Sequence, residues 1–361
     1  MAPESFLLRV AEVVEETADA RSVVLEVPSE LQETFAYTPG QFLTVAVPSD
    51  QTGLAARCYS LSSAPHSGQH QITVKRTVDG YASNWIVENL AAGDTLRVLP
   101  PSGIFTPRDI DADFLLFAGG SGITPVMSIA RTALEKGTGK VVLLYANEDE
   151  SSVIFAGQLA ELAEEYADRF TVVHWLVSLQ GLPSEQSLGL FASYFTSYTA
   201  FVCGPAPYMK AVTNALKELG FPRERRHQEK FVSLGGNPFG DVEEVLAAQR
   251  QLDEADDGEE ESAEPEFSGP VAVEVELDGA TYSFDDWRGD KVLLEFLEEK
   301  GVDAPFSCRE GNCSACACLM VEGEVRLLHN EVLDADDLAE GIRLVCQAKP
   351  VSERIRISYN G

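Results

Sequence analysis

The chain has 361 residues, 45% apolar and 24% charged, a composition typical of a soluble globular protein with two or three domains. Its 27 basic and 58 acidic residues give a net charge of −31, which argues against a nucleic-acid or anionic-membrane partner because phosphate would be repelled. The negative charge is consistent with docking to a partner that has a basic patch. It is equally consistent with a role in solubility or with adaptation to a salty cytoplasm. No apolar run spans a bilayer, and Met1–Glu15 lacks a signal-peptide layout, so we expect a cytoplasmic protein.

Residues 1–107 are predicted to form a small antiparallel β-barrel. Short β-type runs alternate there with turn signals such as Pro39-Gly40 and Gly93-Asp94, a spacing typical of such barrels. The expected strands are Ser22–Val27, Gln41–Val47, His70–Val78 and Thr95–Leu99.

One strand of this region carries Arg57-Cys58-Tyr59-Ser60. An Arg can neutralise a pyrophosphate, an aromatic ring can stack on an isoalloxazine, and a hydroxyl can bond to its reactive nitrogen. Lys75 then precedes Gly80-Tyr81-Ala82-Ser83, where Ser83 is predicted to begin a helix whose free N–H groups meet the same pyrophosphate. A polar strand containing an Arg is common, so the pattern gains weight only together with other motifs.

Residues 108–240 are predicted to form an α/β domain with a parallel sheet, because strand-like and helix-like runs alternate. The expected strands are Phe114–Ala118, Val141–Ala146, Thr171–Leu176 and Ala200–Cys203, and the expected helices are Pro125–Lys136, Phe155–Tyr166 and Ala206–Leu219.

Two turns in this domain are candidates for binding a dinucleotide. Gly119-Gly120-Ser121-Gly122-Ile123-Thr124 joins a strand to a helix, and glycines there let phosphates approach the N–H groups at the helix start. Cys203-Gly204-Pro205 ends a second strand and leads into another helix, a position where α/β sheets bind ligands. A single glycine-rich turn often has no ligand-binding role, and the turn that begins at Gly119 does not match the GxGxxG pattern.

Residues 241–267 are predicted to be a linker. The segment holds twelve acidic residues and one basic residue, and its second half has too few apolar side chains to order itself. A short helix is expected around Val242–Leu252.

Residues 268–361 contain five of the seven cysteines. Cys308, Cys313 and Cys316 have the spacing C-x4-C-x2-C, and Cys346 follows after 29 residues, which is the plant-type pattern for a [2Fe–2S] cluster. A zinc site is the alternative, although zinc usually takes paired C-x2-C units or Cys with His. Cys318 is expected to be a small buried side chain rather than a ligand. Expected strands at Val271–Leu277, Thr281–Phe284 and Ile355–Tyr359, with a helix at Lys291–Glu299, suit a β-grasp fold.

Together these motifs resemble the ferredoxin–NADP reductase superfamily over residues 5–240 and a plant-type ferredoxin over 268–361. The fused order is similar to that of phenylacetyl-CoA epoxidase reductases and, more closely, of the reductase components of 3-ketosteroid 9α-hydroxylase. The resemblance implies a multidomain α+β protein with an FAD-binding barrel, a nicotinamide-binding α/β domain and a [2Fe–2S] domain. It also implies electron transfer from NADH through FAD and the cluster to an oxygenase, which we expect to be of the Rieske type.

The resemblance also implies roles for individual residues. Arg57 would bind the FAD pyrophosphate, Tyr59 would stack on the flavin and Ser60 would face its N5. The remaining cofactor-binding positions would be Lys75, Gly80, Ala82 and Ser83 for FAD, and Gly120, Thr124, Cys203, Gly204 and Pro205 for the nicotinamide. Glu229 and Phe231 occupy the place of the late acidic and aromatic residues beside the flavin, so Tyr59, Ser60, Glu229 and Phe231 are the candidate catalytic residues.

One position departs from the pattern of the relatives. Many have an Arg after Tyr-Ala-Asn or Tyr-Gly-Asn, whereas this chain has Glu148 after Asn147. A carboxylate can accept a hydrogen bond from a ribose 2′-hydroxyl but repels a 2′-phosphate, so we expect NADH to be preferred, with NADPH possible. The alternative is that Glu148 belongs to a solvated acidic turn.

Three rival functions remain open at this stage. A phenylacetyl-CoA-type epoxidase or another ring or alkane hydroxylase is the alternative acceptor. A non-enzymatic electron carrier or redox sensor would require that the flavin site has been lost. The intact Arg57-Cys58-Tyr59-Ser60 motif argues against this alternative. The third alternative is a zinc-stabilised scaffold, and measuring the metal content of the protein would distinguish it from an iron–sulfur protein.

Overall fold

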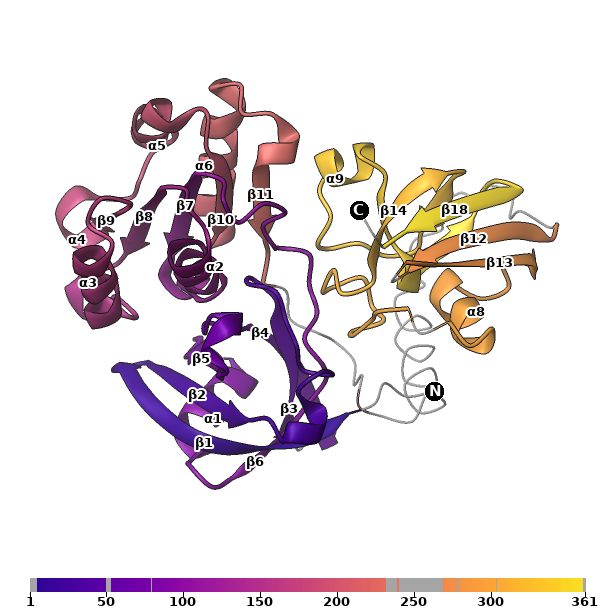
Figure 1. Ribbon diagram of the computed structural model, residues 1–361, viewed down its shortest axis with the longest axis horizontal. Coiled ribbons are helices and arrows are strands. Elements are labelled where there is room, and N and C mark those ends of the chain that lie inside the picture. The colour runs from indigo at the N-terminus through magenta and orange to yellow at the C-terminus, as the bar shows by residue number, and fades with distance from the viewer. Residues whose placement is uncertain are drawn as a thin grey trace.

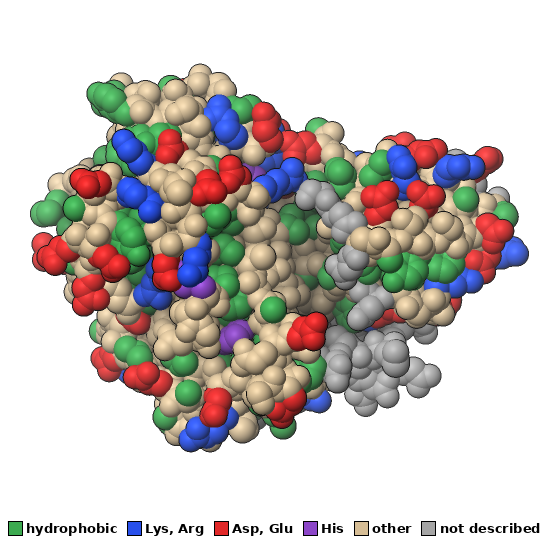
Figure 2. Space-filling view, in the orientation of Figure 1, with side chains coloured by type: hydrophobic (Ala, Val, Ile, Leu, Met, Phe, Trp, Pro, Cys, Tyr) green, Lys and Arg blue, Asp and Glu red, His purple; other side chains and the backbone are tan. Residues whose placement is uncertain are grey.

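The computed structural model describes residues 5–49, 53–78, 80–231, 239, 269–277, 279–302 and 304–359. The predicted linker, including Val242–Leu252, lies outside the described residues. Three sheet-containing bodies follow one another along the chain, and the third lies beside both of the others (Figure 1). Figure 2 shows acidic side chains spread over the visible face of all three. No helix in the described part of the chain is both long and apolar enough to cross a membrane.

The first body is an antiparallel barrel with sheet order β4-β3-β6-β1-β2-β5. A bridge between Leu61 and Ile72 joins the chain after β4 to β5, so the outer strands meet and the sheet closes. Alternate residues such as Leu8 and Val10 point inward and are fully buried. Its elements are β1 (Phe6–Thr17), β2 (Ala20–Glu26), β3 (Phe42–Ser49), β4 (Gly53–Ser60), β5 (His70–Lys75), β6 (Thr95–Val98) and helix α1 (Tyr81–Asn89).

The second body is a parallel five-stranded sheet of order β11-β10-β7-β8-β9. Its strands are β7 (Phe114–Gly119), β8 (Val141–Asn147), β9 (Phe170–Leu176), β10 (Thr199–Cys203) and β11 (Arg226–Glu229). Its helices are α2 (Ile123–Lys136), α3 (Ala156–Glu165), α4 (Val177–Gln180), α5 (Glu185–Ala192) and α6 (Ala206–Glu218). Helix α2 begins two residues earlier than expected, since the glycine turn runs directly into it.

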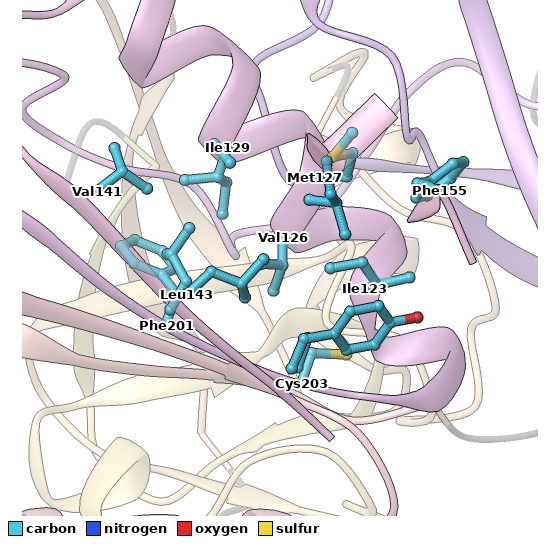
Figure 3. Close-up of a cluster of buried hydrophobic side chains, with 14 of the residues drawn as sticks. Ile123, Val126, Met127, Ile129, Val141, Leu143, Phe155, Phe201 and Cys203 are labelled. Carbon is cyan, nitrogen blue, oxygen red and sulfur yellow. The ribbon is translucent and has the colours of Figure 1, made fainter. Parts of the chain in front are cut away.

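Alternation along β7 determines which helices cover which face of this sheet. Leu116 belongs to the core that includes α2 and α3, whereas Leu115 and Phe117 belong to the core that includes α5 and α6. Figure 3 shows side chains of α2 packed over those of the sheet, with Cys203 among them. The chain therefore turns to opposite faces after the adjacent strands β7 and β10, which is where sheets of this kind bind ligands.

The third body is a mixed five-stranded sheet of order β13-β12-β18-β14-β16 with a separate β15-β17 pair. Strands β12 and β18 are parallel, and helix α8 packs over the sheet through Leu293, Leu294 and Leu297. The elements are β12 (Val271–Leu277), β13 (Ala280–Trp287), α8 (Leu293–Glu299), β14 (Ala317–Glu322), β15 (Val325–Leu327), α9 (Ala335–Ala339), β16 (Ile342–Leu344), β17 (Ala348–Pro350) and β18 (Arg354–Ser358). This is the β-grasp arrangement expected from the sequence.

Candidate functional site

A cavity of about 820 Å³ lies between the barrel and the α/β body. This volume is in the range of cofactor and ligand sites. Most of the residues predicted to bind cofactors line it, and they are Arg57, Tyr59, Ser60, Lys75, Gly80, Ala82, Ser83, Gly120, Thr124, Gly204 and Pro205. Phe231, one of the candidate catalytic residues, also lines it.

Strand β4 delivers the first group of these side chains. Tyr59 is half-buried, and its burial raises the pKa of the phenol well above its ordinary value, so the ring stays neutral. Ser60 is buried beside it, and the guanidinium of Arg57 donates to the carbonyl of Ala56 at 2.6 Å. A neutral aromatic ring, a hydroxyl and a cation therefore lie along one strand at the cavity wall.

Strand β5 adds a polar face that the sequence patterns indicated only in part. Thr73 and Lys75 of β5 line the cavity because residues two apart share one side of a strand, and Thr77, two residues beyond the end of β5, also lines it. Lys75 also forms an ion pair with Asp19 at 3.5 Å. This alternation was visible in the sequence and would have indicated both threonines.

Helix α1 begins at Tyr81, with Gly80 preceding it, so the expectation that Ser83 begins the helix was wrong. Ser83 lies inside the first turn, where its hydroxyl accepts a hydrogen bond of 3.2 Å from the backbone N–H of Thr77. This bond ties the preceding loop to the helix. Ala82 and Ser83 nevertheless line the cavity, so the free N–H groups of the first turn lie at its wall, where they suit an anion.

The turns after β7 and β10 meet backbone to backbone. A Cβ atom on Gly122 would lie 2.2 Å from the carbonyl oxygen of Cys203, and one on Gly204 would lie 3.0 Å from the Cα of Gly119. Gly120 instead has a φ of +53° with open space around it, and its carbonyl accepts a 3.1 Å hydrogen bond from Tyr145. Glycine is therefore required at Gly122 for space and favoured at Gly120 for conformation.

Two predicted nicotinamide residues do not line this cavity. The side chain of Cys203 is fully buried in the core that includes α2 (Figure 3), and Cys203 is not among the residues that line the cavity. Glu148 is exposed just beyond β8, where its carbonyl accepts a hydrogen bond from Ser178. The sequence located the turns after β7 and β10 correctly, but it did not reveal which way the side chain of Cys203 points.

Among the described residues, the hydroxyl of Tyr208 is buried and has no hydrogen-bond partner. Tyr208 is on α6, and its ring lies about 3 Å from the Cβ positions of Gly119 and Gly204. A buried hydroxyl without a partner is costly, but Tyr208 does not line the cavity. The fit to a dinucleotide therefore rests on the two glycine turns, since Gly119, Gly120 and Gly204 do line it.

A second, smaller cavity of about 20 Å³ adjoins the first. It is lined by residues of all three bodies, namely Phe42, Cys58, Ser60, Glu229, Lys230, Phe231, Asn312 and Cys313. Burial raises the pKa of Glu229 to about 8, so this carboxyl group is neutral at pH 7. A proton-holding group thus lines the same small cavity as Ser60.

This raised pKa predicts a pH-dependent stability. Below about pH 4.5 Glu229 is protonated in both folded and unfolded chains, whereas between that pH and about 8 only the unfolded chain ionises, so stability is lost as pH rises. Relative to Glu229→Gln, the wild type should lose roughly 2–4 kcal/mol of unfolding free energy between pH 5 and 8. Denaturant unfolding of both proteins across this range measures it. Exposed Glu224→Gln is the control, and parallel wild-type and Glu229→Gln curves would contradict the prediction.

The four predicted metal-ligand cysteines gather in the third body and are almost completely buried. The N–H groups of Glu310 and Asn312 each point to the sulfur of Cys308 at 3.4 Å, and the N–H of Cys308 points to the sulfur of Cys313 at 3.3 Å. Amide groups aimed at thiolates stabilise negative charge on the sulfurs, so the loop fits an iron–sulfur cluster.

The turn of this loop depends on unusual backbone. Gly311 has a φ of +78°, and a Cβ there would lie 2.6 Å from the carbonyl oxygen of His329. Arg309 and Ser314 also have positive φ, which is uncommon for residues other than glycine. Cys318 is buried in β14, as expected of a core side chain.

Three family models match successive parts of the chain. They are an oxidoreductase FAD-binding domain at residues 7–106, an oxidoreductase NAD-binding domain at 116–214 and a 2Fe-2S iron-sulfur cluster binding domain at 275–351. The chain is 50% identical over 356 residues to the 3-ketosteroid-9-alpha-monooxygenase, ferredoxin reductase component, of Rhodococcus rhodochrous, covering 98% of this chain and 97% of that protein. The chain belongs to the family of monooxygenase ferredoxin reductase components.

A more distant relative aligns with nearly the whole chain, and a solved structure shares its fold. This reductase is 31% identical to one of the subunits of 1,2-phenylacetyl-CoA epoxidase of Escherichia coli strain K12, over 98% of this chain and 97% of that protein. The crystal structure of phthalate dioxygenase reductase matches it in fold with a TM-score of 0.53, 24% identity and 98% coverage of both chains. The reductase is thus an oxidoreductase with FAD, nicotinamide and [2Fe–2S] cofactors, and the match at 275–351 decides against a zinc scaffold.

Proposed function

We propose that this reductase passes electrons from NADH through FAD and a [2Fe–2S] cluster to the terminal Rieske-type oxygenase of a 3-ketosteroid 9α-hydroxylase. The observation that carries the proposal is the small cavity that Ser60, of the flavin strand, shares with Cys313, of the cluster loop. Identity of 50% with a reductase of that name supports the choice of acceptor. The reaction would take place in the cytoplasm, where NADH is available.

Bound FAD accepts a hydride as two electrons and a cluster accepts one at a time, so the pair joins a two-electron donor to a one-electron acceptor. On this proposal Arg57 and the first turn of α1 hold the pyrophosphate, while Tyr59 stacks against the flavin and Ser60 faces its N5. Gly120 and Thr124, with the turn at Gly204, bind the nicotinamide nucleotide. Glu229 keeps a proton beside Ser60, and Phe231 covers the opening.

The cluster would be held by the thiolates of Cys308, Cys313, Cys316 and Cys346. In the folded chain these side chains are buried, and the loop that carries three of them packs against Phe42 and Ala56 of the barrel. This packing leaves only a cavity of about 20 Å³ between the flavin strand and the cluster loop, so few water molecules would separate the two proposed cofactors.

A visible spectrum of the protein purified without oxygen tests this scheme. Flavin bands and a broad cluster shoulder should both bleach on addition of NADH. Recombination with purified oxygenase should then make steroid hydroxylation depend on the reductase. A colourless protein would overturn the cofactor assignment, whereas hydroxylation that proceeds equally well without the reductase would overturn the assignment of the acceptor.

Glu148 makes a prediction about the choice of nucleotide. We expect kcat/KM to favour NADH, because the carboxylate suits a ribose hydroxyl and repels a 2′-phosphate. Glu148→Arg should raise kcat/KM for NADPH about tenfold, a change typical of one charge-assisted contact. Exposed Glu150→Arg provides a matched control for the added charge. Wild-type preference for NADPH, or equal effects of both variants, would refute this role for Glu148.

A second candidate acceptor is a phenylacetyl-CoA epoxidase. The 31% identity to a component of that enzyme favours it, since the two proteins align over nearly their whole lengths. Recombination with each oxygenase, and comparison of NADH oxidation coupled to product formation, distinguishes the two acceptors.

A further inference from the structure

One buried hydrogen bond links the barrel to the cluster loop. The hydroxyl oxygens of Thr44 in β3 and Ser307 lie 2.5 Å apart although 263 residues separate them in the chain. Each side chain is only 1% exposed. Because Ser307 immediately precedes Cys308, this bond acts on the first residue of the cluster motif.

The surroundings of the bond are apolar on both sides. Phe42, Ala46, Ala56 and Leu99 of the barrel form one buried cluster with Cys308, Cys313 and Ala315 of the loop. Within the described part of the chain, removing the Thr44 hydroxyl would leave the buried hydroxyl of Ser307 without a partner, whereas removing the Ser307 hydroxyl would leave Thr44 only a longer contact with the sulfur of Cys58. A bond in this setting discriminates strongly between correct and shifted arrangements of the two surfaces.

Thr44 also connects to the strand that carries the proposed flavin residues. It is paired with Cys58 across β3 and β4, and its hydroxyl lies 3.5 Å from the Cys58 sulfur. Cys58 directly precedes Tyr59 and lines the small cavity together with Cys313. One threonine hydroxyl thus contacts both the strand leading to Tyr59 and the loop leading to Cys308.

The polar contacts between the third body and the α/β body are of a different kind, because each involves a carboxylate. Arg223 pairs with Asp337, Lys217 lies 2.8 Å from Asp336, and Arg226 lies 3.4 Å from the same carboxylate. These charged contacts join the α/β body to α9, away from the cluster loop. Those that are partly exposed are weakened by salt, whereas a neutral buried bond is not.

We propose that Thr44 and Ser307 are positioning residues that hold the cluster loop in register against β4. The proposal rests on the proposed function, because the benefit of this register is a fixed separation between the flavin strand and the cluster ligands. Charged contacts at α9 bring the bodies together, and the Thr44–Ser307 bond selects one arrangement among those the charges permit.

Hydrogen–deuterium exchange of the full-length protein measures this register directly, without any assay of activity. Thr44→Val keeps the shape of the side chain but removes the hydroxyl, and it should speed amide exchange in residues 308–316 and in β3 about tenfold. Ser307→Ala should speed exchange in the same residues by a similar factor. The double variant should exchange no faster than either single variant, because both substitutions remove the same hydrogen bond. The effect should persist at about 0.5 M salt.

Two further variants separate positioning from general damage. Thr44→Ser keeps the hydroxyl and should restore protection of the loop. Thr132→Val removes a buried hydroxyl that bonds within α2 to the carbonyl of Ser128, so it should leave the loop unchanged. In anaerobic rapid mixing with NADH, Thr44→Val should leave flavin bleaching unchanged and slow cluster bleaching about tenfold, with both midpoint potentials unaltered.

Unchanged exchange in Thr44→Val, additive effects of the two single substitutions, or an equal effect from Thr132→Val would overturn the proposal. Altered midpoint potentials that account for the slower cluster bleaching would do so as well. Absence of flavin or cluster would instead refute the proposed function, while the exchange measurements would still test the register of the loop.

Discussion

Replacing Cys308, Cys313, Cys316 or Cys346 by serine is expected to prevent assembly of the cluster while NADH still reduces the flavin. The thiolates come from one loop and from a distant segment, and the loop N–H groups already point at the Cys308 and Cys313 sulfurs. Serine is a harder and less acidic ligand, so the site would not hold iron and sulfide. Transfer to the oxygenase should fall by at least about a hundredfold, a larger loss than changing an outer-shell partner causes.

The visible spectrum and the iron content of each variant measure this loss. Cys318→Ala is the matched control, because Cys318 is equally buried in the same body but lies in β14, after the third ligand. It should retain a full complement of iron. A Cys318 variant without a cluster, or a Cys346 variant with a normal one, would mean that the ligand set is wrongly assigned.

Gly122→Ala is expected to destabilise the α/β body and to abolish nicotinamide binding. The added Cβ would lie 2.2 Å from the carbonyl oxygen of Cys203 and 2.6 Å from the nitrogen of Gly204. Both neighbours are backbone atoms that cannot rotate away, so the two turns must separate. Such overpacking costs about 3 kcal/mol, and it moves the turns that are proposed to bind the dinucleotide.

Gly120→Ala makes an informative comparison. Nothing lies within 4 Å of its Cβ position, so only the positive φ of the backbone is unfavourable, which costs about 1 kcal/mol. Denaturant unfolding, followed together with the KM for NADH, should therefore rank Gly122→Ala as the more damaging change. Equal stability of the two variants would show that the turns after β7 and β10 do not pack as described.

Sequence patterns located the site residues that act through local chemistry. The cysteine spacing, Arg57-Cys58-Tyr59-Ser60 and the glycine turn at 119–122 each place their groups within a few residues, so the motif and its surroundings are one piece of chain. Strand β1 (Phe6–Thr17) was missed because register shifts between Val10 and Glu12, and between Glu15 and Thr17, interrupt the alternation of its buried residues.

The orientation of side chains was harder to predict than the position of elements. Cys203 ends a strand at the correct turn, yet its sulfur faces α2 because alternate residues of β10 point to opposite faces. Helix α1 begins at Tyr81 because Gly80 already has the extended backbone of a residue that precedes a helix, so Ser83, three residues after Gly80, is not its cap.

The sequence by itself determined the order of three folds and the ligand types within each, because strand alternation, glycine turns and cysteine spacing are local properties of the chain. Only the tertiary structure decided how the three parts face one another. The contacts of Ser307 with Thr44, and of Asp337 with Arg223, join segments more than a hundred residues apart. No local pattern encodes such pairings, because they depend on complementary surfaces that exist only after each domain has folded.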